Sequence, residues 1–249
     1  MSKDAEVSVI IASLNEEKSI GRCIEKVKMA LRRLGNRGEI IVADNSTDRT
    51  ADIARAAGAK VVMPDELGYG NALAFGIDHS VGQYIIIGDA DGTYDFADAP
   101  KFFQPLRSGE AEFVIGSRFK GEIKSGSMPW LHRYIGNPVL TLTLNMLLGT
   151  NVSDAHCGIR GFTRAVWDKM DRQLVAEDLC SEMLRYISRN GLRVKEVPVV
   201  YYPRTERPKA GTLLHGCRCF RFLVLRILFN SQTWTILPIR RRSNAACHN

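Results

Sequence analysis

Short apolar runs alternate with amphipathic stretches along the first half of the chain. The runs have the length and β-branched composition of buried strands, and they lie at residues 7–13, 39–43, 60–63, 84–88 and 112–115. Between the first two runs, apolar side chains recur at steps of three or four residues, which predicts a helix through Ile20, Ile24, Val27, Leu31 and Leu34. Further helices are predicted over residues 51–57 and 71–80. This alternation predicts an α/β fold with a mostly parallel, doubly wound sheet and helices on both faces.

The second half of the chain is less regular. Helices are predicted over residues 128–148, in two pieces split at Pro138, and over residues 176–190; residues 154–162 form a loop or a strand, and residues 194–202 a strand. Residues 212–229 mix basic and apolar positions and predict a C-terminal amphipathic helix. Since no repeat or linker interrupts the pattern, we expect a single domain over residues 5–235, followed by a basic tail at 236–249.

The composition fits an ordinary globular chain. Of the 249 residues, 45% are hydrophobic and 24% are charged, which is enough to build a core. The six cysteines show no CxxC pair, so we expect reduced thiols rather than a disulfide framework or a zinc site. The N-terminal stretch lacks the pattern of a signal peptide, and no run reaches the roughly 20 apolar residues of a membrane span. We therefore predict a cytoplasmic protein.

The net charge of +7 points to an anionic partner. Basic residues crowd the end of the chain, at Arg204, Arg207, Lys209, Arg218, Arg221, Arg226, Arg240, Arg241 and Arg242. Such a cluster suits phosphates of nucleotides, nucleic acids or lipids, but no nucleic-acid-binding motif accompanies it, so a nucleic-acid partner is not expected. The segment 212–229 fits peripheral contact with the inner face of a membrane, packing on its own domain, or a homodimer contact.

Polar residues follow several of the predicted strands. Asn15 and Glu16 come after the first strand, Asp44 ends the second, and Asp89 and Asp91 follow the fourth. The fifth strand is followed by residues 116–118, which include Arg118. Because parallel strands deliver their carboxyl ends to one edge of a sheet, we expect a ligand site there.

Asp89 and Asp91 form a D-x-D pattern directly after an isoleucine run. Carboxylates of this kind suit Mg²⁺ or Mn²⁺, which typically bridge a protein to a diphosphate. We interpret Asp95, the third carboxylate in this stretch, as a turn or helix-start residue.

Several longer segments resemble one known family. VIIASLNEE, VADNSTDRTADIA, GYGNALAFGI, IIIGDADGTYD and VIGSRF stand in the order and spacing of the family 2 glycosyltransferases with the GT-A fold. GSMPWLHRYIGNPVLT, SDAHCGIRGF and SEMLRYISRNGLRVKEVPV are similar to the dolichol-phosphate mannose or glucose synthase-like branch. The resemblance implies a metal-dependent inverting transfer from a UDP- or GDP-sugar to a polyprenyl phosphate. The alternative acceptor is a hydroxyl of a soluble small molecule.

The resemblance also implies roles for individual residues. Nucleotide-sugar contacts are expected from Ala12, Asn15, Glu16, Asp44, Ser46, Gly70, Asp89, Ala90 and Asp91, with Gly68 in the same glycine-containing turn. Asp91 and Asp89 would hold the Mg²⁺ or Mn²⁺ ion. Acceptor or phosphate contacts are expected from Arg118, Arg133, Glu182 and Arg204. The catalytic candidates are Asp178, Asp154 and Asp89.

The need for a general base depends on the acceptor. A polyprenyl phosphate is already ionised at neutral pH, whereas a hydroxyl needs a carboxylate within hydrogen-bond reach, for which Asp178 and Asp154 are the candidates. Many relatives continue with membrane-spanning helices where this sequence has IRRRSNAACHN, which makes a soluble acceptor a serious competitor.

Two other classes fit the sequence less well. A nucleotidyltransferase usually carries a Gly-rich basic loop after the first strand, where this chain has the acidic SLNEE. A non-catalytic sugar-nucleotide-binding protein would be expected to lose the metal carboxylates, which are present here.

Overall fold

The structure is a computed structural model that describes residues 5–35, 37–171 and 179–205. The chain divides into two units, Met1–Ala210 and Gly211–Asn249, and all described residues belong to the first. The predicted amphipathic helix at 212–229 and the basic tail at 236–249 lie outside the described residues, as does Asp178.

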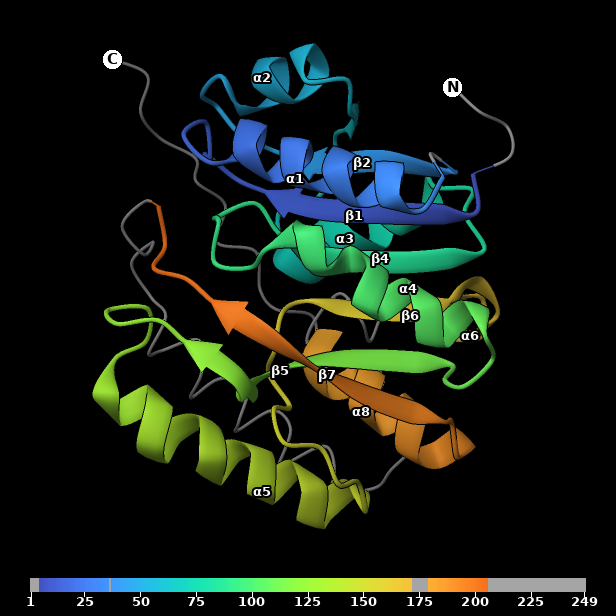
Figure 1. Cartoon of the computed structure of the whole chain (residues 1–249), viewed down its shortest axis with the longest axis vertical. Coiled ribbons are helices and arrows are strands. Elements are labelled where there is room, and N and C mark those ends of the chain that lie inside the picture. Colours follow the sequence, from blue (N-terminus) through green and yellow to red (C-terminus); the bar gives the residue numbers. More distant parts are fainter. Residues whose placement is uncertain (1–4, 36, 172–178, 206–249) are drawn as a thin grey trace, which may run out of the picture. The chain divides into compact units, whose positions relative to one another are not determined.

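Strands and helices alternate as the sequence pattern predicts (Figure 1). In chain order they are β1 (Val7–Ser13), α1 (Ile20–Arg33), β2 (Gly38–Asp44), α2 (Thr50–Ala56), β3 (Lys60–Val62), α3 (Tyr69–Asp78), β4 (Tyr84–Asp89), the short 3-10 helix η1 (Phe96–Asp98), α4 (Ala99–Arg107), β5 (Phe113–Ile123), the π-helix η2 (His132–Gly136), α5 (Asn137–Leu148), β6 (Arg160–Thr163), α6 (Arg164–Trp167), α8 (Leu179–Asn190) and β7 (Val194–Tyr201).

The strands form one seven-stranded sheet in the order β3-β2-β1-β4-β6-β5-β7. All neighbouring pairs are parallel except those of β6, which runs antiparallel to both β4 and β5. The pairing aligns the carboxyl ends of the three central strands, because Ser13 of β1 lies opposite Asp44 of β2 and Ala12 lies opposite Asp89 of β4. This alignment brings the polar residues after these strands to one edge.

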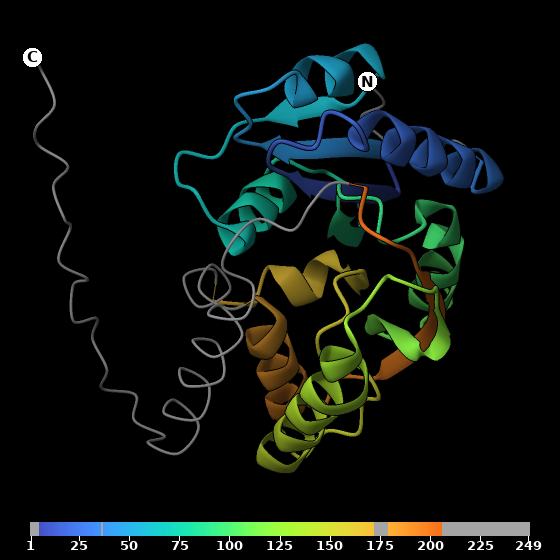
Figure 2. The ribbon, with the colours of Figure 1, turned by 90° about the vertical axis from the view of Figure 1, so that its left-hand side faces the viewer.

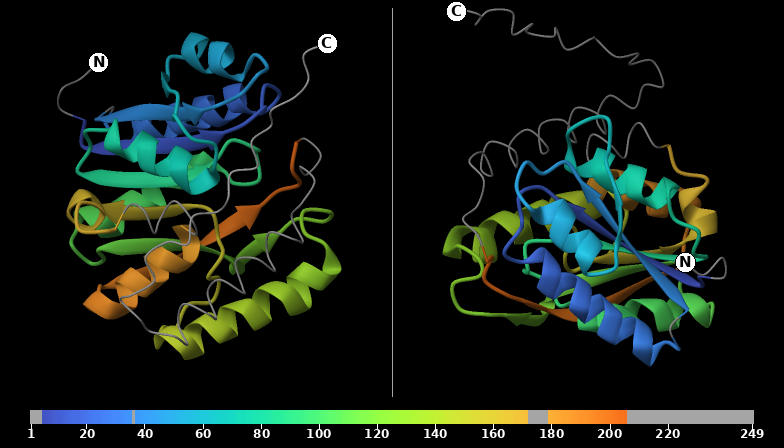
Figure 3. Two further views of the ribbon diagram at one scale, coloured as in Figure 1. Left: turned by 180° about the vertical axis from the view of Figure 1, so that it is seen from behind. Right: turned by 90° about the horizontal axis from the view of Figure 1, so that it is seen from above.

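Helices cover both faces of the sheet. Figures 1 and 3 show α1 and α4 on one face and α3 and α8 on the other. The predicted apolar stripe of α1 is buried, including Ile20, Ile24, Val27 and Leu31. The α5 helix contacts α8, and Figure 2 shows the two side by side. The predicted doubly wound sheet is therefore confirmed.

Two parts of the sheet differ from the prediction. The sequence pattern ends the fifth strand at residue 115, but β5 continues to Ile123 because its second half pairs with β7 after a register shift between Ser117 and Glu122. Arg118 therefore lies within a strand and not after its end. The stretch 154–162 contributes β6, whose antiparallel direction the pattern does not reveal.

The helices after β4 also differ. The structure has a helix, α4, that was not predicted, with Pro105 inside it. The expected helix over 128–148 is present in two pieces, but they meet at Asn137, which places Pro138 in the first turn of α5. Among the described residues, no helix is long and apolar enough to cross a membrane.

Candidate active site

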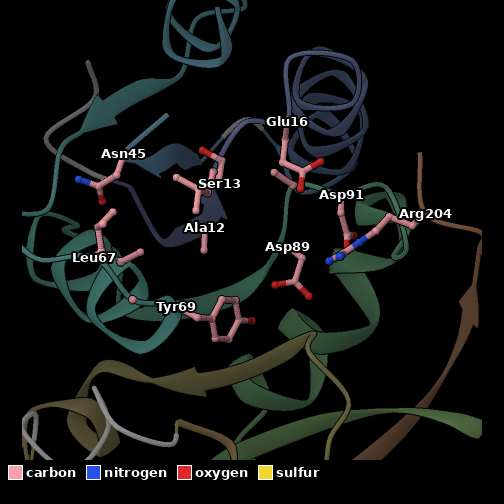
Figure 4. Close-up of a pocket in the computed structure, with 13 residues that line it drawn as sticks. Ala12, Ser13, Glu16, Asn45, Leu67, Tyr69, Asp89, Asp91 and Arg204 are labelled. Carbon is pink, nitrogen blue, oxygen red and sulfur yellow. The ribbon is translucent and has the colours of Figure 1, made fainter. Parts of the chain in front are cut away.

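A pocket opens at the carboxyl ends of β1 and β4 (Figure 4). Its wall combines carboxylates, small residues and one cation: Ala12, Ser13, Leu14, Glu16, Asn45, Leu67, Gly68, Tyr69, Ala72, Asp89, Ala90, Asp91 and Arg204. Of the predicted nucleotide-sugar contacts, Ala12, Glu16, Asp89, Ala90 and Asp91 line this pocket. The pocket lining as a whole brings together residues from five separate segments of the sequence.

The remaining predicted contacts are not part of the pocket lining: Gly70 is buried in α3, while Asn15, Asp44 and Ser46 tie the loops next to the pocket together. Asp44 is buried, and its Oδ1 accepts hydrogen bonds from the hydroxyls of Ser13, at 2.6 Å, and Ser46, at 2.5 Å. The backbone N–H of Asn15 donates to the Ser46 hydroxyl at 2.6 Å, and the Asn15 side chain accepts from the backbone N–H of Thr47. These bonds fix the loops after β1 and β2 to each other, so Asp44 orients Ser13 at the pocket wall.

Glu16 places a third carboxylate beside the pocket. Its side chain is buried, and its Oε2 accepts a hydrogen bond from the Ser19 hydroxyl at 3.3 Å. Its backbone N–H donates to the Thr50 hydroxyl at 2.9 Å, which fixes the loop before α1. Glu16 does not cap α1, since that helix begins four residues later, at Ile20.

Asp91 lies in a turn just beyond β4, and each of its carboxylate oxygens has a separate set of partners. Oδ1 accepts from the backbone N–H and the hydroxyl of Thr93, at 2.9 and 2.6 Å, as in an Asx-turn. Oδ2 accepts from Nε and Nη2 of Arg204, at 2.7 and 2.5 Å. Figure 4 shows the two side chains pointing toward one another. One oxygen of Asp91 is therefore held by the turn and the other by a cation.

Asp89, the last residue of β4, has an unusual protonation equilibrium. Burial raises the pKa of its carboxyl to about 7, and the negative charges of Asp91 and Glu16 act in the same direction. The hydrogen bond from Tyr69 and the charge of Arg204 lower the pKa but do not offset the increase. Three acidic groups near one another thus carry more negative charge than Arg204 alone balances.

This excess of negative charge is the condition under which a divalent cation would bind. Among the residues that the structure describes, no three His, Cys, Asp or Glu side chains form a ready-made metal site. Mg²⁺ and related ions, however, are commonly held by one or two carboxylates while substrate phosphates and water complete the shell. Asp89 and Asp91 fit that arrangement.

Two of the predicted acceptor and base residues bind each other. Arg118 donates to Asp154 through Nε, at 2.7 Å, through Nη2, at 2.6 Å, and through its backbone N–H, at 3.0 Å. Arg118 is 7% exposed and Asp154 is fully buried. The pair lies outside the pocket lining, and both oxygens of Asp154 are engaged by Arg118, as in a structural ion pair.

Two further predicted phosphate contacts also lie away from the pocket lining. Arg133 is in η2, with its guanidinium 5.4 Å from the centre of the Tyr134 ring. Glu182, on α8, is buried and forms an ion pair with Arg185 at 2.6 Å. Arg204 is the one member of this group that lines the pocket.

The pocket residues that the sequence prediction missed come from two regions: Ser13, Leu14 and Asn45 after β1 and β2, and Leu67, Tyr69 and Ala72 at the start of α3 or just before it. Leu67 and Tyr69 line the pocket on either side of Gly68, whose φ of 146° is a conformation that favours glycine. Tyr69 as a whole residue is 42% exposed, but desolvation of its hydroxyl, together with the charge of Asp89, raises the pKa of the phenol well above its usual value. In the sequence, Tyr69 stands between two glycines at the start of a helix, and this pattern could have indicated a residue that lines a site.

The interpretation of Asp95 as a turn or helix-start residue is confirmed, since its side chain accepts a hydrogen bond from the Ala97 N–H at the start of η1.

Solved structures share the fold of this chain, and curated proteins are similar to it in sequence. The solved structure of glucosyl-3-phosphoglycerate synthase from Mycobacterium tuberculosis, in complex with Mn²⁺, UDP and glucosyl-3-phosphoglycerate, matches with a TM-score of 0.69 at 22% identity. The match covers 89% of this chain and 79% of that one. It shows that the two share a fold, and the predicted GT-A fold is confirmed.

Curated relatives extend the comparison to the sequence. The low-salt glycan biosynthesis hexosyltransferase Agl6 of Haloferax volcanii is 44% identical over 229 residues, which cover 90% of this chain and 55% of Agl6. The chain therefore spans little more than half the length of that relative. A dolichyl-phosphate hexose transferase of the same organism is 28% identical over 220 residues, or 88% of this chain and 92% of that protein, in agreement with the predicted branch. The model of the family described as glycosyl transferase family 2 matches residues 8–170. The chain belongs to glycosyl transferase family 2.

Proposed function

We propose that this chain is a metal-dependent inverting glycosyltransferase that moves a sugar from a nucleotide-diphospho-sugar to a polyprenyl phosphate. The observation that carries the proposal is the pocket in which Asp89 and Asp91 lie beside Glu16 and Arg204, at the carboxyl ends of parallel strands. Ligands of open α/β sheets bind at this edge. The activities named for the hexosyltransferase relatives support the same reaction class.

The pocket residues divide between the two ends of the donor. Ser13, Glu16 and Asn45 offer oxygens that can accept hydrogen bonds from ribose hydroxyls or base N–H groups. Asp89 and Asp91 would hold a Mg²⁺ or Mn²⁺ ion, which would neutralise the diphosphate and stabilise it as the leaving group. Attack from the side opposite the leaving diphosphate would give a β-linked product from an α-linked donor.

A polyprenyl phosphate is the preferred acceptor because its oxygen is already ionised and needs no general base. In agreement with this, Asp154 is occupied by Arg118, and a role as a base would require that buried pair to separate. The alternative acceptor is a hydroxyl of a soluble molecule, with Asp178 or Asp154 as the base. The structure of the synthase from Mycobacterium tuberculosis, which shares the fold, contains glucosyl-3-phosphoglycerate. This small-molecule ligand supports the alternative.

Peripheral membrane contact is part of the proposal, and η2 and α5 supply a surface for it. Along these two helices and the residues just before them, an outer apolar stripe is 45–75% exposed: Trp130, Leu131, Tyr134, Ile135, Val139, Leu142 and Met146. Between residues 125 and 153 the sequence has one cationic residue, Arg133, and no acidic one, while Lys124 is paired with Glu122. Apolar and aromatic side chains with a basic neighbour favour an anionic lipid surface. A second copy of this chain is a weaker fit, since each copy would bring the same positive charge to the contact.

Extraction of a labelled product tests the acceptor. The chain is incubated with radiolabelled UDP- and GDP-sugars, Mn²⁺ and a polyprenyl phosphate, and the mixture is then extracted with butanol. Label in the butanol phase that depends on the polyprenyl phosphate is the expected result. Label that stays only in a water-soluble product, formed with a soluble acceptor, would contradict the lipid acceptor and support the hydroxyl alternative.

Substitutions that place negative charges in the exposed apolar stripe test the membrane contact. The double variant Leu142→Glu/Met146→Glu is expected to lose roughly tenfold or more in binding to anionic vesicles, because the apolar side chains that would enter the interface become charged. Transfer to a short-chain, water-soluble polyprenyl phosphate should continue. The matched control, Met63→Glu/Val81→Glu, changes two apolar residues that are 60% and 61% exposed outside the stripe. If vesicle binding is unchanged but a dimer dissociates, the stripe is a contact between copies.

The packing around Asp89 gives a further prediction. A Cβ atom at Gly158 would lie 2.6 Å from Asp89 Oδ2 and 3.1 Å from the Tyr94 ring, so an added methyl group must displace the carboxylate. Gly158→Ala is expected to lower sugar transfer by roughly 10–100-fold, since small displacements of catalytic groups have effects of this size. Gly136→Ala is the control, because its nearest neighbour would be at an ordinary 3.6 Å. Equal initial rates for both variants and the wild type would contradict the assigned role of Asp89.

A further inference from the structure

Arg204 lies against the carboxylate that the proposed function assigns to a metal ion. Among the described residues that line the pocket it is the only cation, and two of its nitrogens contact a single oxygen, Oδ2 of Asp91. The other oxygen of Asp91 accepts two hydrogen bonds from Thr93. A divalent ion that binds Asp91 through Oδ2 would therefore meet the guanidinium of Arg204 at the same atom.

The backbone around Arg204 is anchored, while its side chain has room to move. The N–H of Tyr202 donates to the carbonyl of Thr93 at 2.9 Å, and the N–H of Thr205 donates to the carbonyl of Asp91 at 3.2 Å. These bonds fix the chain on both sides of Arg204 to the Asp91 turn. The Arg204 side chain is 37% exposed, in contrast to the 6% of Asp91. Rotation of one side chain is enough to free Oδ2, without movement of the segment.

We infer that Arg204 is a positioning residue that occupies the metal-binding oxygen of Asp91 in the donor-free protein and turns to the donor's diphosphate when a divalent ion takes its place. This inference rests on the proposed function. The guanidinium balances part of the acidic charge while the pocket is empty of donor. Once displaced, it stays within a pocket that receives a diphosphate, for which its planar fork of N–H groups is well suited.

Such an exchange couples the two ligands. When no nucleotide is present, the divalent ion must compete with Arg204 for Asp91. The affinity of the protein for the ion is therefore lower without nucleotide than with it. With a nucleoside diphosphate in the pocket, the displaced guanidinium gains a new partner and the competition weakens. By linkage, the factor by which the nucleotide tightens ion binding equals the factor by which the ion tightens nucleotide binding.

The test is a Mn²⁺ titration followed by electron paramagnetic resonance, on the full chain. Without nucleotide, Arg204→Gln is expected to bind Mn²⁺ about tenfold more tightly than the wild type, because an ion pair with Asp91 no longer has to be broken. Arg204→Lys keeps the charge and should remain close to the wild type. Arg49→Gln is the matched control, since Arg49 is 79% exposed and pairs with Glu17 on the surface. With saturating UDP, the advantage of Arg204→Gln should disappear or reverse.

The direction of the change separates this role from a structural one. Damage to the site would weaken Mn²⁺ binding, whereas removal of a competitor strengthens it. If Arg204→Gln binds Mn²⁺ no more tightly than the wild type without nucleotide, the inference is overturned, and the proposed function stands as long as UDP still promotes Mn²⁺ binding. If the wild type transfers sugar but binds no Mn²⁺ with or without UDP, the metal dependence of the proposed function fails, and the inference fails with it.

Discussion

Asp91→Asn is expected to lower divalent-dependent sugar transfer by about 10²–10³-fold, the usual size of the loss when one group that stabilises developing charge is removed. An amide keeps the oxygen that accepts the two hydrogen bonds from Thr93, so the turn after β4 should persist. The second carboxylate oxygen, which now contacts Arg204, is replaced by an NH₂ group that cannot bind a cation. The substitution therefore removes the charge while it preserves the fold of the turn.

Initial rates over a range of Mn²⁺ concentrations, together with thermal unfolding, check this expectation. Asp95→Asn is a suitable control in the same segment. Asp95 caps η1 and pairs with Lys26, and asparagine is an equally good cap. The ion pair is half-buried and still reached by solvent, so its loss should cost little stability compared with a fully buried pair. Wild-type rates in Asp91→Asn, at any Mn²⁺ concentration, would rule out the assigned metal ligand and with it the proposed mechanism.

The part of the site built by β1, β2 and β4 could be predicted from the sequence. Strands buried on both faces appear as continuous apolar runs, and their carboxyl ends meet at one edge because the strands are parallel. The residues that follow each run are therefore brought together whatever the details of packing. This reasoning brought Glu16, Asp89 and Asp91 to the edge of the sheet where the structure has the pocket.

The same reasoning could not separate residues at the wall from residues behind it. Asp44 ends β2 at the same edge of the sheet as the others. Its carboxylate, however, accepts hydrogen bonds from the hydroxyls of Ser13 and Ser46 and does not line the pocket. The choice depends on side-chain rotamers and on partners from two loops, neither of which follows from strand periodicity. Asn45, the next residue, lines the pocket instead.

The arrangement of β6 in the second half of the sheet could not be predicted from the sequence for a different reason. β6 has four residues, RGFT, and contains no apolar run. Its Arg160 is fully buried, with its guanidinium nitrogens donating to the carbonyls of Cys157, Ala155 and Cys180. Ala155 and Cys157 belong to the loop just before β6, and Cys180 belongs to α8, so these contacts follow no periodic pattern. The antiparallel direction of β6 is seen only in its pairing with β4 and β5.

The pair of Arg118 and Asp154 shows the same limit at the level of single residues. The two lie 36 positions apart, and each carries a side chain that is typical of catalysis or phosphate binding. Only the fold reveals that the carboxylate and the guanidinium form two side-chain hydrogen bonds with each other, at 2.6 and 2.7 Å. The pair has a clear expected effect on stability.

Asp154→Asn is expected to reduce the free energy of unfolding by about 3–5 kcal/mol, the cost of leaving one member of a buried ion pair without its partner. For a chain of this size, each kcal/mol lowers the melting temperature by roughly 2–4 °C, so the shift should exceed about 6 °C. Lys124→Met is the control, since Lys124 and Glu122 form an exposed pair, and exposed ion pairs contribute little stability. A shift for Asp154→Asn no larger than the control's would contradict the structural role.

The double variant Arg118→Met/Asp154→Leu separates stability from function. It replaces both charges with apolar groups, and such replacements of buried ion pairs are often neutral or stabilising. Most of the lost stability should therefore return, as measured by the same thermal unfolding. If Arg118 serves only the fold, transfer to a polyprenyl phosphate should return as well. If the stable double variant has a strongly raised KM for that acceptor, Arg118 contacts the acceptor phosphate during turnover, and the ion pair with Asp154 must then open when the acceptor binds.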